Sequence, residues 1–487
     1  MRLRAALPIA AGLGLLSALN FDPWSVPFTM LAAVAGLFWL LRSMPDASRR
    51  AVAAVGATYG VVFMGVLIWW MNAVSAGAWV ALVLAETAFF ALIAVLLRTV
   101  LQARGWPVWA AGAWVLGETV RGAFPFSGFP WGRLVHTAID TPLAPFVRVL
   151  GMTGTSLLMA VLAACALLVA TRRWLAAVPI AAALALGLVL PTGLAGATGQ
   201  ERTVAVVQGN TPGPFLQWPR SEIFQLHVEA TERIDQPVDL VLWPENGSDL
   251  DPFTNAYARS ELRRVQAVVE APILVGAILD GPDEQTAYNA GVVVDETGPR
   301  DDFYVKRKPV PYGEYVPFRR ELGDLVPRFD RDIPRDLVGG DEPGALQVAG
   351  TVLGDTICWD VAYDDVVGGS IEHGAEMIVV QTSNASFMDF GRRTQPEQQF
   401  AISRLRAIET GRWVLVPSTN GVSGIIDAHG EVVERAPLKE SATMIADVPL
   451  ADGVSWGVSA RTPAIIVATV LTLAGWAAGV RSGRRNR

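Results

Sequence analysis

The sequence predicts a multi-span α-helical membrane domain joined to a polar α/β domain. Of the 487 residues, 52% are hydrophobic and only 17% are charged, which is too apolar for an ordinary soluble protein of this length. Apolar stretches long enough to cross a bilayer core of about 30 Å occur towards both ends of the chain. Between them lies a polar block. We therefore predict a membrane domain over residues 1–195, an α/β domain over 196–458, and a last span with a basic tail over 459–487.

Seven apolar stretches are clear candidates for membrane spans. They lie near residues 5–20, 25–42, 51–73, 77–102, 145–171, 174–195 and 463–480. An eighth stretch, near 106–120, is shorter and rich in tryptophan, and we predict that it also spans the membrane. The first stretch follows a basic start and could be taken for a signal peptide, but other spans follow it so closely that an uncleaved helix is expected.

The placement of arginine supports eight spans, because short cytoplasmic loops retain positive charge. With a cytoplasmic N-terminus, all the basic clusters fall on one side. They comprise Arg2, Arg4, Arg42, Arg49, Arg50, Arg98, Arg104, Arg172, Arg173, Arg481, Arg484, Arg485 and Arg487. The polar block then faces away from the cytoplasm, and we expect a multi-pass protein of the cell membrane. Without the eighth span, the arginines after the fifth stretch would change sides.

The polar block has the pattern of a layered α/β domain. Short apolar runs predict buried strands at Thr203–Val207, Asp239–Trp243, Ile273–Gly276, Ala290–Val294, Met377–Val380 and Trp413–Val416. Apolar residues at three- and four-residue spacing predict helices at Ser221–Asp235, Tyr257–Val269 and Pro396–Thr410. Pro396 suits the first turn of a helix, and Gly411 suits the residue after its end.

Charge and cysteine content narrow the possible functions. The formal net charge of −7 offers no basic surface for nucleic acid, so no nucleic-acid partner is expected. Cys165 lies within an apolar run and would sit at membrane depth, which leaves Cys358 as a lone thiol in the polar block. In an oxidising compartment an unpaired cysteine suggests a reactive role, although an inert buried cysteine is the alternative.

Three polar side chains follow or end predicted strands: Glu245, Lys306 and Cys358. Each residue alone is weak evidence for a functional site. Together they supply a thiol nucleophile, a carboxylate that can take its proton and a cation for the developing oxyanion, which are the groups needed for cysteine acyl transfer. The four histidines lie in unrelated contexts and no G-x-S-x-G motif is present, which argues against Ser-His-Asp hydrolysis and a histidine-rich metal site. No metal or cofactor is expected.

The motifs around these residues resemble a known family. Trp-Pro-Glu245, then Lys306-x-x-Pro-Val-Pro-Tyr-Gly-Glu314, then Ile-Cys358-Trp-Asp360 resemble the Glu-Lys-Cys triad of the nitrilase superfamily. The spans on both sides resemble its membrane branch, the apolipoprotein N-acyltransferases. Further matches are Gln208-Gly-Asn210, Thr382-Ser-Asn384, Arg406-Ala-Ile-Glu-Thr-Gly-Arg412, Ser418-Thr-Asn-Gly421 and, in the membrane half, Glu118, Arg121 and Gly128-Phe-Pro-Trp131.

The resemblance implies a nitrilase-like, four-layer α-β-β-α sandwich in which Glu245 is the general base, Lys306 stabilises the oxyanion and Cys358 is the nucleophile. The residues with supporting or substrate-binding roles would be Glu314 and Asp360 near the triad, the backbone N–H of Trp359 in the oxyanion hole, and Trp218 and Asn384 at the substrate. The family often has Tyr-Glu where this chain has Trp359-Asp360, and the segment after Asn384 also departs from its pattern.

The resemblance implies transfer of a fatty acyl group from a membrane phospholipid to the N-terminal α-amino group of a diacylglyceryl lipoprotein, through a thioester on Cys358. One alternative is a membrane-tethered amidase of the nitrilase type, for which one anchor would suffice. Another is a non-catalytic membrane protein that binds lipids or lipoproteins. In the membrane half, Glu118 and Arg121 match the family, but they could also simply pair on one helix face. Glu86 lies within a span, where ionisable residues usually face the bundle interior.

Overall fold

The computed structural model describes residues 1–211, 213, 221–322, 331, 333–388 and 393–485. Its contacts divide the chain into two units. The helical unit comprises Met1–Pro191 and Ser455–Arg487, and the sandwich unit comprises Thr192–Val454. The sequence placed these boundaries at 196 and 459, a few residues further along the chain in both cases.

Each of the eight predicted apolar stretches overlaps a helix of the helical unit. These are α1 (Leu3–Ala18), α2 (Thr29–Arg42), α3 (Arg49–Leu67), α4 (Ala76–Val100), α5 (Trp106–Arg121), α6 (Val147–Ala170), α7 (Ala177–Gly187) and α16 (Arg461–Arg485). Four helical segments are long and apolar enough to cross a membrane: Arg49–Leu67, Ala76–Val100, Ala144–Ala170 and Arg461–Gly483. The other four are shorter, so the count of eight spans stays a prediction.

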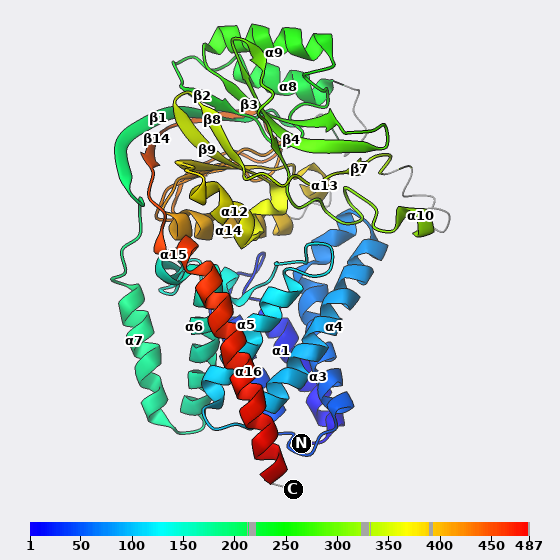
Figure 1. Ribbon diagram of the computed structural model, residues 1–487, viewed down its shortest axis with the longest axis vertical. Helices are drawn as coiled ribbons and strands as arrows, with labels where there is room; N and C mark the ends of the chain where they lie inside the picture. The colour runs from blue at the N-terminus through cyan, green and yellow to red at the C-terminus, as the bar shows by residue number, and fades with distance from the viewer. Residues whose placement is uncertain (212, 214–220, 323–330, 332, 389–392, 486–487) are drawn as a thin grey trace. The chain divides into compact units, whose positions relative to one another are not determined.

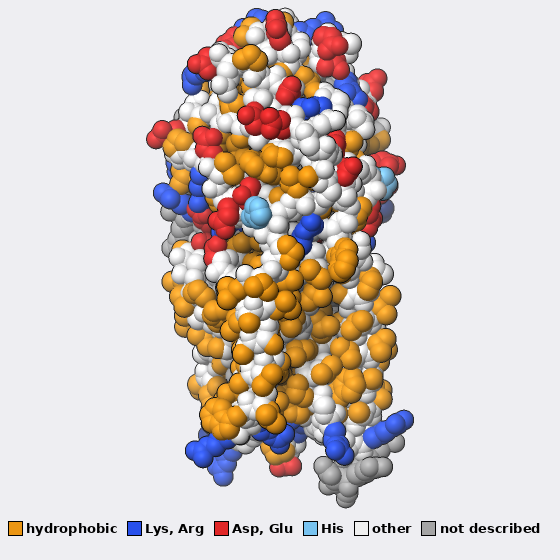
Figure 2. Space-filling view, turned by 90° about the vertical axis from the view of Figure 1, so that its left-hand side faces the viewer, with side chains coloured by type: hydrophobic (Ala, Val, Ile, Leu, Met, Phe, Trp, Pro, Cys, Tyr) orange, Lys and Arg blue, Asp and Glu red, His pale blue; other side chains and the backbone are white. Residues whose placement is uncertain are grey.

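The surface of the helical unit is apolar, as expected for helices that face lipid rather than water. Figure 2 shows hydrophobic side chains over much of this surface, with Lys and Arg gathered at one end of the unit. Leu92, Leu175 and Leu188 are 67%, 87% and 76% exposed. Soluble monomeric proteins rarely expose so large an apolar surface.

Basic segments that are distant in the sequence meet at one end of the helical unit. Arg42 donates to the carbonyl of Leu101 at 2.6 Å, and Arg98 donates to the carbonyl of Met44 at 3.2 Å. The N-terminal ammonium group donates to the carbonyl of Ser43 at 2.6 Å. The start of α1, the α2–α3 turn and the end of α4 therefore lie together.

Arg121, at the end of α5, is a buried cation that fixes the loop following its own helix. Its guanidinium donates to Glu86 Oε2 of α4 at 3.1 Å, to the carbonyl of Phe129 at 3.0 Å and to the carbonyl of Trp131 at 2.7 Å. The side chains of Arg121 and Glu86 are only 1% and 3% exposed. The expectation that Glu86 faces the bundle interior is confirmed.

Glu118, also on α5, binds the same loop, but as a hydrogen-bond acceptor. Its Oε1 accepts hydrogen bonds from the indole of Trp114 at 2.9 Å and from the backbone N–H of Leu134 at 2.7 Å. Glu118 and Arg121 thus each bind the loop between α5 and α6, and the ion pair of Arg121 is with Glu86 on another helix.

The sandwich unit contains two mixed β-sheets. The first has the order β14-β1-β2-β3-β4-β5, with β6 and β7 also paired to β4. Its strands are β1 (Ala197–Gln208), β2 (Leu240–Leu242), β3 (Ile273–Asp280), β4 (Thr286–Asp295), β5 (Gly298–Pro299), β6 (Tyr304–Val305), β7 (Asp336–Leu337) and β14 (Ala442–Ala451). The second has the order β13-β12-β11-β10-β9-β8, comprising β8 (Ala345–Val348), β9 (Thr351–Ile357), β10 (Met377–Gln381), β11 (Val414–Val416), β12 (Gly424–Ile426) and β13 (Val432–Arg435).

Helices cover the outer face of each sheet, which gives four layers within this unit (Figure 1). α8 (Glu222–Thr231) and α9 (Ala256–Val269) pack on the first sheet, while α12 (Asp364–Glu372) and α14 (Thr394–Thr410) pack on the second. The inner faces of the two sheets share one apolar core, which includes Val206, Leu242, Leu353, Ile357 and Val379. The predicted α-β-β-α arrangement is present.

Local sequence explains where the crossover helices begin and end. The Asn255 side chain accepts a hydrogen bond from the N–H of Ala258 at the start of α9. Gly411 ends α14 in the left-handed region, with φ of 62°, where glycine avoids the steric cost of a Cβ. Pro396 lies in the first turn of α14, as predicted. α14 connects β10 to the parallel strand β11, so it returns the chain across the sheet.

Candidate active site

The three predicted catalytic side chains are placed by strand ends from both sheets. Glu245 follows β2 and Lys306 follows β6 in the first sheet, whereas Cys358 follows β9 in the second. Each of these strands contributes apolar side chains to the core between the sheets. A layered fold commonly presents functional side chains at such strand ends. There the residue lies just beyond the hydrogen-bonded ladder, but the adjoining sheet still holds its backbone rigid.

Lys306 is a fully enclosed ammonium held between two carboxylates. Its Nζ lies 3.2 Å from Glu245 Oε1 and 2.7 Å from Glu314 Oε1, and its side chain is 1% exposed. Burial opposes the charged form, but Glu245 and Glu314 outweigh it and raise the Lys306 pKa well above its ordinary value. Lys306 is therefore a fixed cation at physiological pH.

Glu245 is a buried carboxylate whose two oxygens have different partners. Oε1 accepts from Lys306 and from the amide of Asn289 at 2.7 Å, and Oε2 accepts from the backbone N–H of Ser383 at 2.9 Å. These donors come from three different segments of the chain, and Glu245 is only 3% exposed. The carboxylate is thus held in one orientation before any substrate arrives.

Cys358 lies at a tight turn from β9 into the 3-10 helix η5 (Cys358–Ala362). Its φ of 57° is in the left-handed region, which is uncommon for a residue with a side chain and typical of strained functional positions. Burial raises the Cys358 pKa, and the nearby negative charge of Glu245 raises it further, whereas Lys306 and the backbone N–H of Trp359 lower it. Since the pKa of the Cys358 thiol is raised, a base is needed to remove its proton for attack.

Asp360 ties the nucleophile turn to the segment that carries Lys306. Its carboxylate accepts hydrogen bonds from the Tyr304 hydroxyl at 2.7 Å, the Arg307 N–H at 3.2 Å and the Lys308 N–H at 3.1 Å. Burial raises the pKa of Asp360 to about 6, although Lys306 and these hydrogen bonds act in the opposite direction. Asp360 is completely buried, so it acts by positioning the segment around Lys306.

Two predicted supporting residues lie close to the triad. Glu314 binds Lys306, and its other oxygen accepts from the Val310 N–H at 2.8 Å. The indole N–H of Trp359 donates to the Lys308 carbonyl, and the Trp359 ring packs edge-on against Tyr363 at 5.6 Å between centroids. Glu314 thus binds Lys306 itself, and Trp359 binds the backbone two residues later.

Two residues, Trp218 and Asn384, are predicted to contact the substrate. Trp218 lies outside the described residues. Asn384 is 1% exposed, and its Oδ1 accepts from the Ser418 hydroxyl at 2.8 Å and the Val422 N–H at 3.2 Å. In this structure Asn384 therefore holds neighbouring loops together, and a contact with substrate stays a prediction.

Sequence reasoning missed Asn289, and it assigned no role to Ser383. Asn289 is 1% exposed, and its amide bridges Glu245 and Glu314 at 2.7 and 3.3 Å. Asn289 could have been found from its position directly before the apolar run of β4, because a polar side chain on a buried strand needs a hydrogen-bond partner. Ser383 acts through its backbone N–H, which side-chain identity does not reveal.

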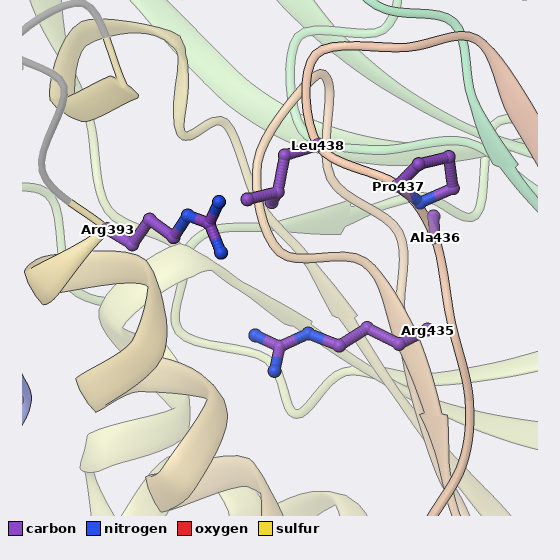
Figure 3. Close-up of a pocket in the computed structure, with 5 residues that line it drawn as sticks. All are labelled: Arg393, Arg435, Ala436, Pro437 and Leu438. Atoms are coloured by element: carbon purple, nitrogen blue, oxygen red, sulfur yellow. The ribbon is translucent and has the colours of Figure 1, made fainter.

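A separate hollow of about 380 Å³ is lined by Arg393, Arg435, Ala436, Pro437 and Leu438. In Figure 3 the guanidinium groups of Arg393 and Arg435 extend into the same space from the start of α14 and the end of β13. Arg435 also pairs with Glu397 at 2.5 Å and lies over the Phe400 ring. None of these lining residues belongs to the triad.

Comparison with known proteins covers both units. Residues 13–165 match the apolipoprotein N-acyltransferase N-terminal domain, and residues 203–457 match the carbon-nitrogen hydrolase family. The chain is 32% identical to an apolipoprotein N-acyltransferase from Mycolicibacterium smegmatis, over 97% of this chain and 84% of that protein. It is 28% identical to one from Pseudomonas putida, over 91% and 90%. An amidase crystal structure from Nesterenkonia sp. aligns with 51% of the chain and 90% of its own, at 20% identity and a TM-score of 0.37.

Proposed function

Since the chain belongs to the apolipoprotein N-acyltransferase family and is an acyltransferase, we propose that Cys358, Lys306 and Glu245 carry out its reaction. The reaction moves a fatty acyl group from a membrane phospholipid to the N-terminal α-amino group of a diacylglyceryl lipoprotein, through a thioester. The observation that supports these roles best is the arrangement around Lys306, which brings a carboxylate and a fixed cation to the strand end that carries the thiol.

In the first half-reaction, Glu245 accepts the proton of Cys358 and the sulfur attacks the ester carbonyl of the phospholipid. The oxyanion that forms is stabilised by the Lys306 ammonium and the Trp359 N–H. When the C–O bond breaks, the proton on Glu245 passes to the departing oxygen, and a lysophospholipid leaves. The acyl group then remains on the sulfur as a thioester.

In the second half-reaction, the lipoprotein amine attacks the thioester carbonyl through a similar oxyanion. Glu245 takes a proton from the amine, an amide bond forms as the C–S bond breaks, and the sulfur recovers a proton. The free enzyme is restored without net change. Two successive transfers through one covalent intermediate give ping-pong kinetics.

The membrane topology forms a second part of the proposal. Eight spans, a cytoplasmic N-terminus and an extracytoplasmic sandwich unit are supported by the one-sided arginine clusters and by their meeting at one end of the helical unit. A topology reporter after Arg487 should be cytoplasmic, and one inserted near Gly281 should be extracytoplasmic. Both reporters on the same side would refute this arrangement.

Transfer can be tested with the full-length protein in detergent micelles that contain phospholipid and a synthetic diacylglyceryl lipopeptide. Mass spectrometry should find one added acyl chain on the lipopeptide amine with the wild type and with Cys165→Ala, but not with Cys358→Ala. Release of ammonia from a soluble amide, without lipopeptide acylation, would favour the amidase alternative. A lipopeptide that is bound but never modified would favour the non-catalytic one.

A further inference from the structure

Asp355 interrupts the apolar inner face of the second sheet. It lies in β9, three residues before Cys358, and in the parallel ladder with β10 it is opposite Val379. The residues two positions away on the same strand, Leu353 and Ile357, both belong to the core between the sheets. Since side chains alternate along a strand, Asp355 points into this core with them.

The Asp355 carboxyl group is fully buried and unpaired. It is 0% exposed, and within the described residues neither of its oxygens has a hydrogen-bond partner. The side-chain oxygen of Gln381 in β10 is in the same situation. The Gln381 amide nitrogen, however, donates to the carbonyl of Trp243 at 2.7 Å and so links the second sheet to the first. A buried polar atom without a partner is costly, so this pair requires an explanation.

Gly291, on β4 of the facing sheet, makes room for both groups. A Cβ at this position would lie 1.9 Å from Asp355 Oδ2 and 2.7 Å from Gln381 Oε1. Asp355 Oδ2 and Gln381 Oε1 both lie beside this position, so they are close to each other. Both are acceptors when Asp355 is ionised, and they would then repel each other. A proton on the carboxyl group would instead allow it to donate a hydrogen bond to the Gln381 oxygen.

We propose that Asp355 is a neutral carboxylic acid that donates its proton to Gln381 Oε1 and thereby positions Glu245. The connection runs through Gln381, whose amide holds the Trp243 carbonyl two residues before Glu245. Asp355 is thus a positioning residue that touches no reacting atom, and its role rests on the proposed role of Glu245 as the base. Neither sequence motifs nor the family comparison assigns it.

The charges around Asp355 favour the neutral acid. Burial raises the pKa of Asp355 well above its ordinary value, and the neighbouring Asp360 raises it further, while the nearby backbone N–H of Thr356 acts against them. The Tyr304 hydroxyl, which is close enough to be affected by Asp355, already donates to Asp360. Burying a second anion beside Asp360 would cost more than retaining the proton.

The test uses full-length protein in a Cys165→Ala background, so that Cys358 is the remaining thiol. The rate of Cys358 alkylation by iodoacetamide, followed by mass spectrometry, reports on proton removal by Glu245 without any lipid substrate. Asp355→Asn keeps an N–H donor for Gln381 and should react within about twofold of the parent. Asp355→Leu keeps the branched shape of the side chain but lacks the donor, and should react about tenfold more slowly, the equivalent of one lost hydrogen bond.

Two further measurements separate positioning from a purely structural effect. In a double-mutant cycle, Asp355→Leu combined with Gln381→Leu should react no more slowly than the slower single variant, because the two residues act in one chain. The infrared difference spectrum between the parent and Asp355→Asn at neutral pH should contain the C=O stretch of a protonated carboxyl group.

Equal alkylation rates for the parent and Asp355→Leu would overturn the proposal, as would an Asp355→Asn variant as slow as Asp355→Leu or an infrared spectrum that lacks the protonated carboxyl band. If the parent transfers no acyl group but alkylation follows the expected order, the proposed function fails and the inference about Asp355 stands.

Discussion

Arg121 in the helical unit and Lys306 in the sandwich unit are both buried cations paired with carboxylates, yet they use their hydrogen-bond donors differently. Arg121 donates to Glu86 and to two backbone carbonyls of the loop after α5. Lys306 donates only to Glu245 and Glu314 among the described residues. An ammonium has three N–H groups, so one remains for a substrate oxygen.

The comparison separates a cation that holds structure from one that is prepared for chemistry. The donors of Arg121 reach backbone atoms, so its removal should affect folding. The surroundings of Lys306 are fixed without it, because Glu245 is also held by Asn289 and Ser383, and Asp360 holds the adjacent backbone. Its removal should therefore affect catalysis more than stability.

The largest expected effect is on stability. Arg121→Met should lower the free energy of unfolding in detergent by about 3–5 kcal/mol, because it leaves Glu86 buried and unpaired. Chemical denaturation followed by tryptophan fluorescence measures this. Arg121→Met combined with Glu86→Leu should recover part of the loss. A single variant as stable as the wild type would show that this ion pair does not fix the loop.

Lys306→Ala should slow formation of the acyl-enzyme about a hundredfold or more, because the oxyanion loses a fixed cation. Single-turnover measurement with phospholipid gives this rate. Lys439→Ala, which removes an exposed lysine from the same unit, is the matched control and should leave the rate unchanged. A Lys306→Ala variant that unfolds as readily as Arg121→Met would remove the distinction between the two cations.

Asn289→Leu should slow the same step about tenfold, because Glu245 loses one of its three donors while Lys306 and the Ser383 N–H remain. The comparison of kcat with KM is informative, since Asn289 is buried and should leave KM for phospholipid unchanged. A change confined to KM would place Asn289 at the substrate instead.

The smallest effect concerns the pH dependence of stability. Asp360 has a pKa raised to about 6 from 3.8, so between these values the folded chain retains a proton that the unfolded chain releases. The contribution of Asp360 to stability therefore falls as pH rises from about 4 to about 6. Asp360→Asn should remove this part of the slope in denaturation curves measured across that range. An unchanged slope would show that Asp360 is already ionised when folded.

Local patterns were sufficient for the strands and helices that the sequence predicted. Each of the six short apolar runs overlaps a strand, and the three amphipathic segments overlap α8, α9 and α14. The sequence did not predict that β14 returns to pair with β1, because that antiparallel ladder joins segments more than 230 residues apart. Pairing at this distance leaves no periodic signal in either strand.

The site was predictable where a residue's role lies in its own side chain. Glu245, Lys306 and Cys358 follow strands in recognisable motifs, and the structure brings Glu245 and Lys306 into direct contact. Asp355 and Asn289 were not found, because their importance depends on facing side chains from other strands. Arg121 shows the same limit, since its partner is 35 positions away on another helix.

The thioester is the central claim, and its most direct test is the intact mass of the purified protein after incubation with phospholipid alone. The account predicts one added acyl group on Cys358, removed by hydroxylamine at neutral pH, transferred to lipopeptide on its addition, and missing from Lys306→Ala and Glu245→Ala on the same timescale. Cys358→Ala that still acylates the lipopeptide at a comparable rate, or an acyl group found on another residue, would contradict the account.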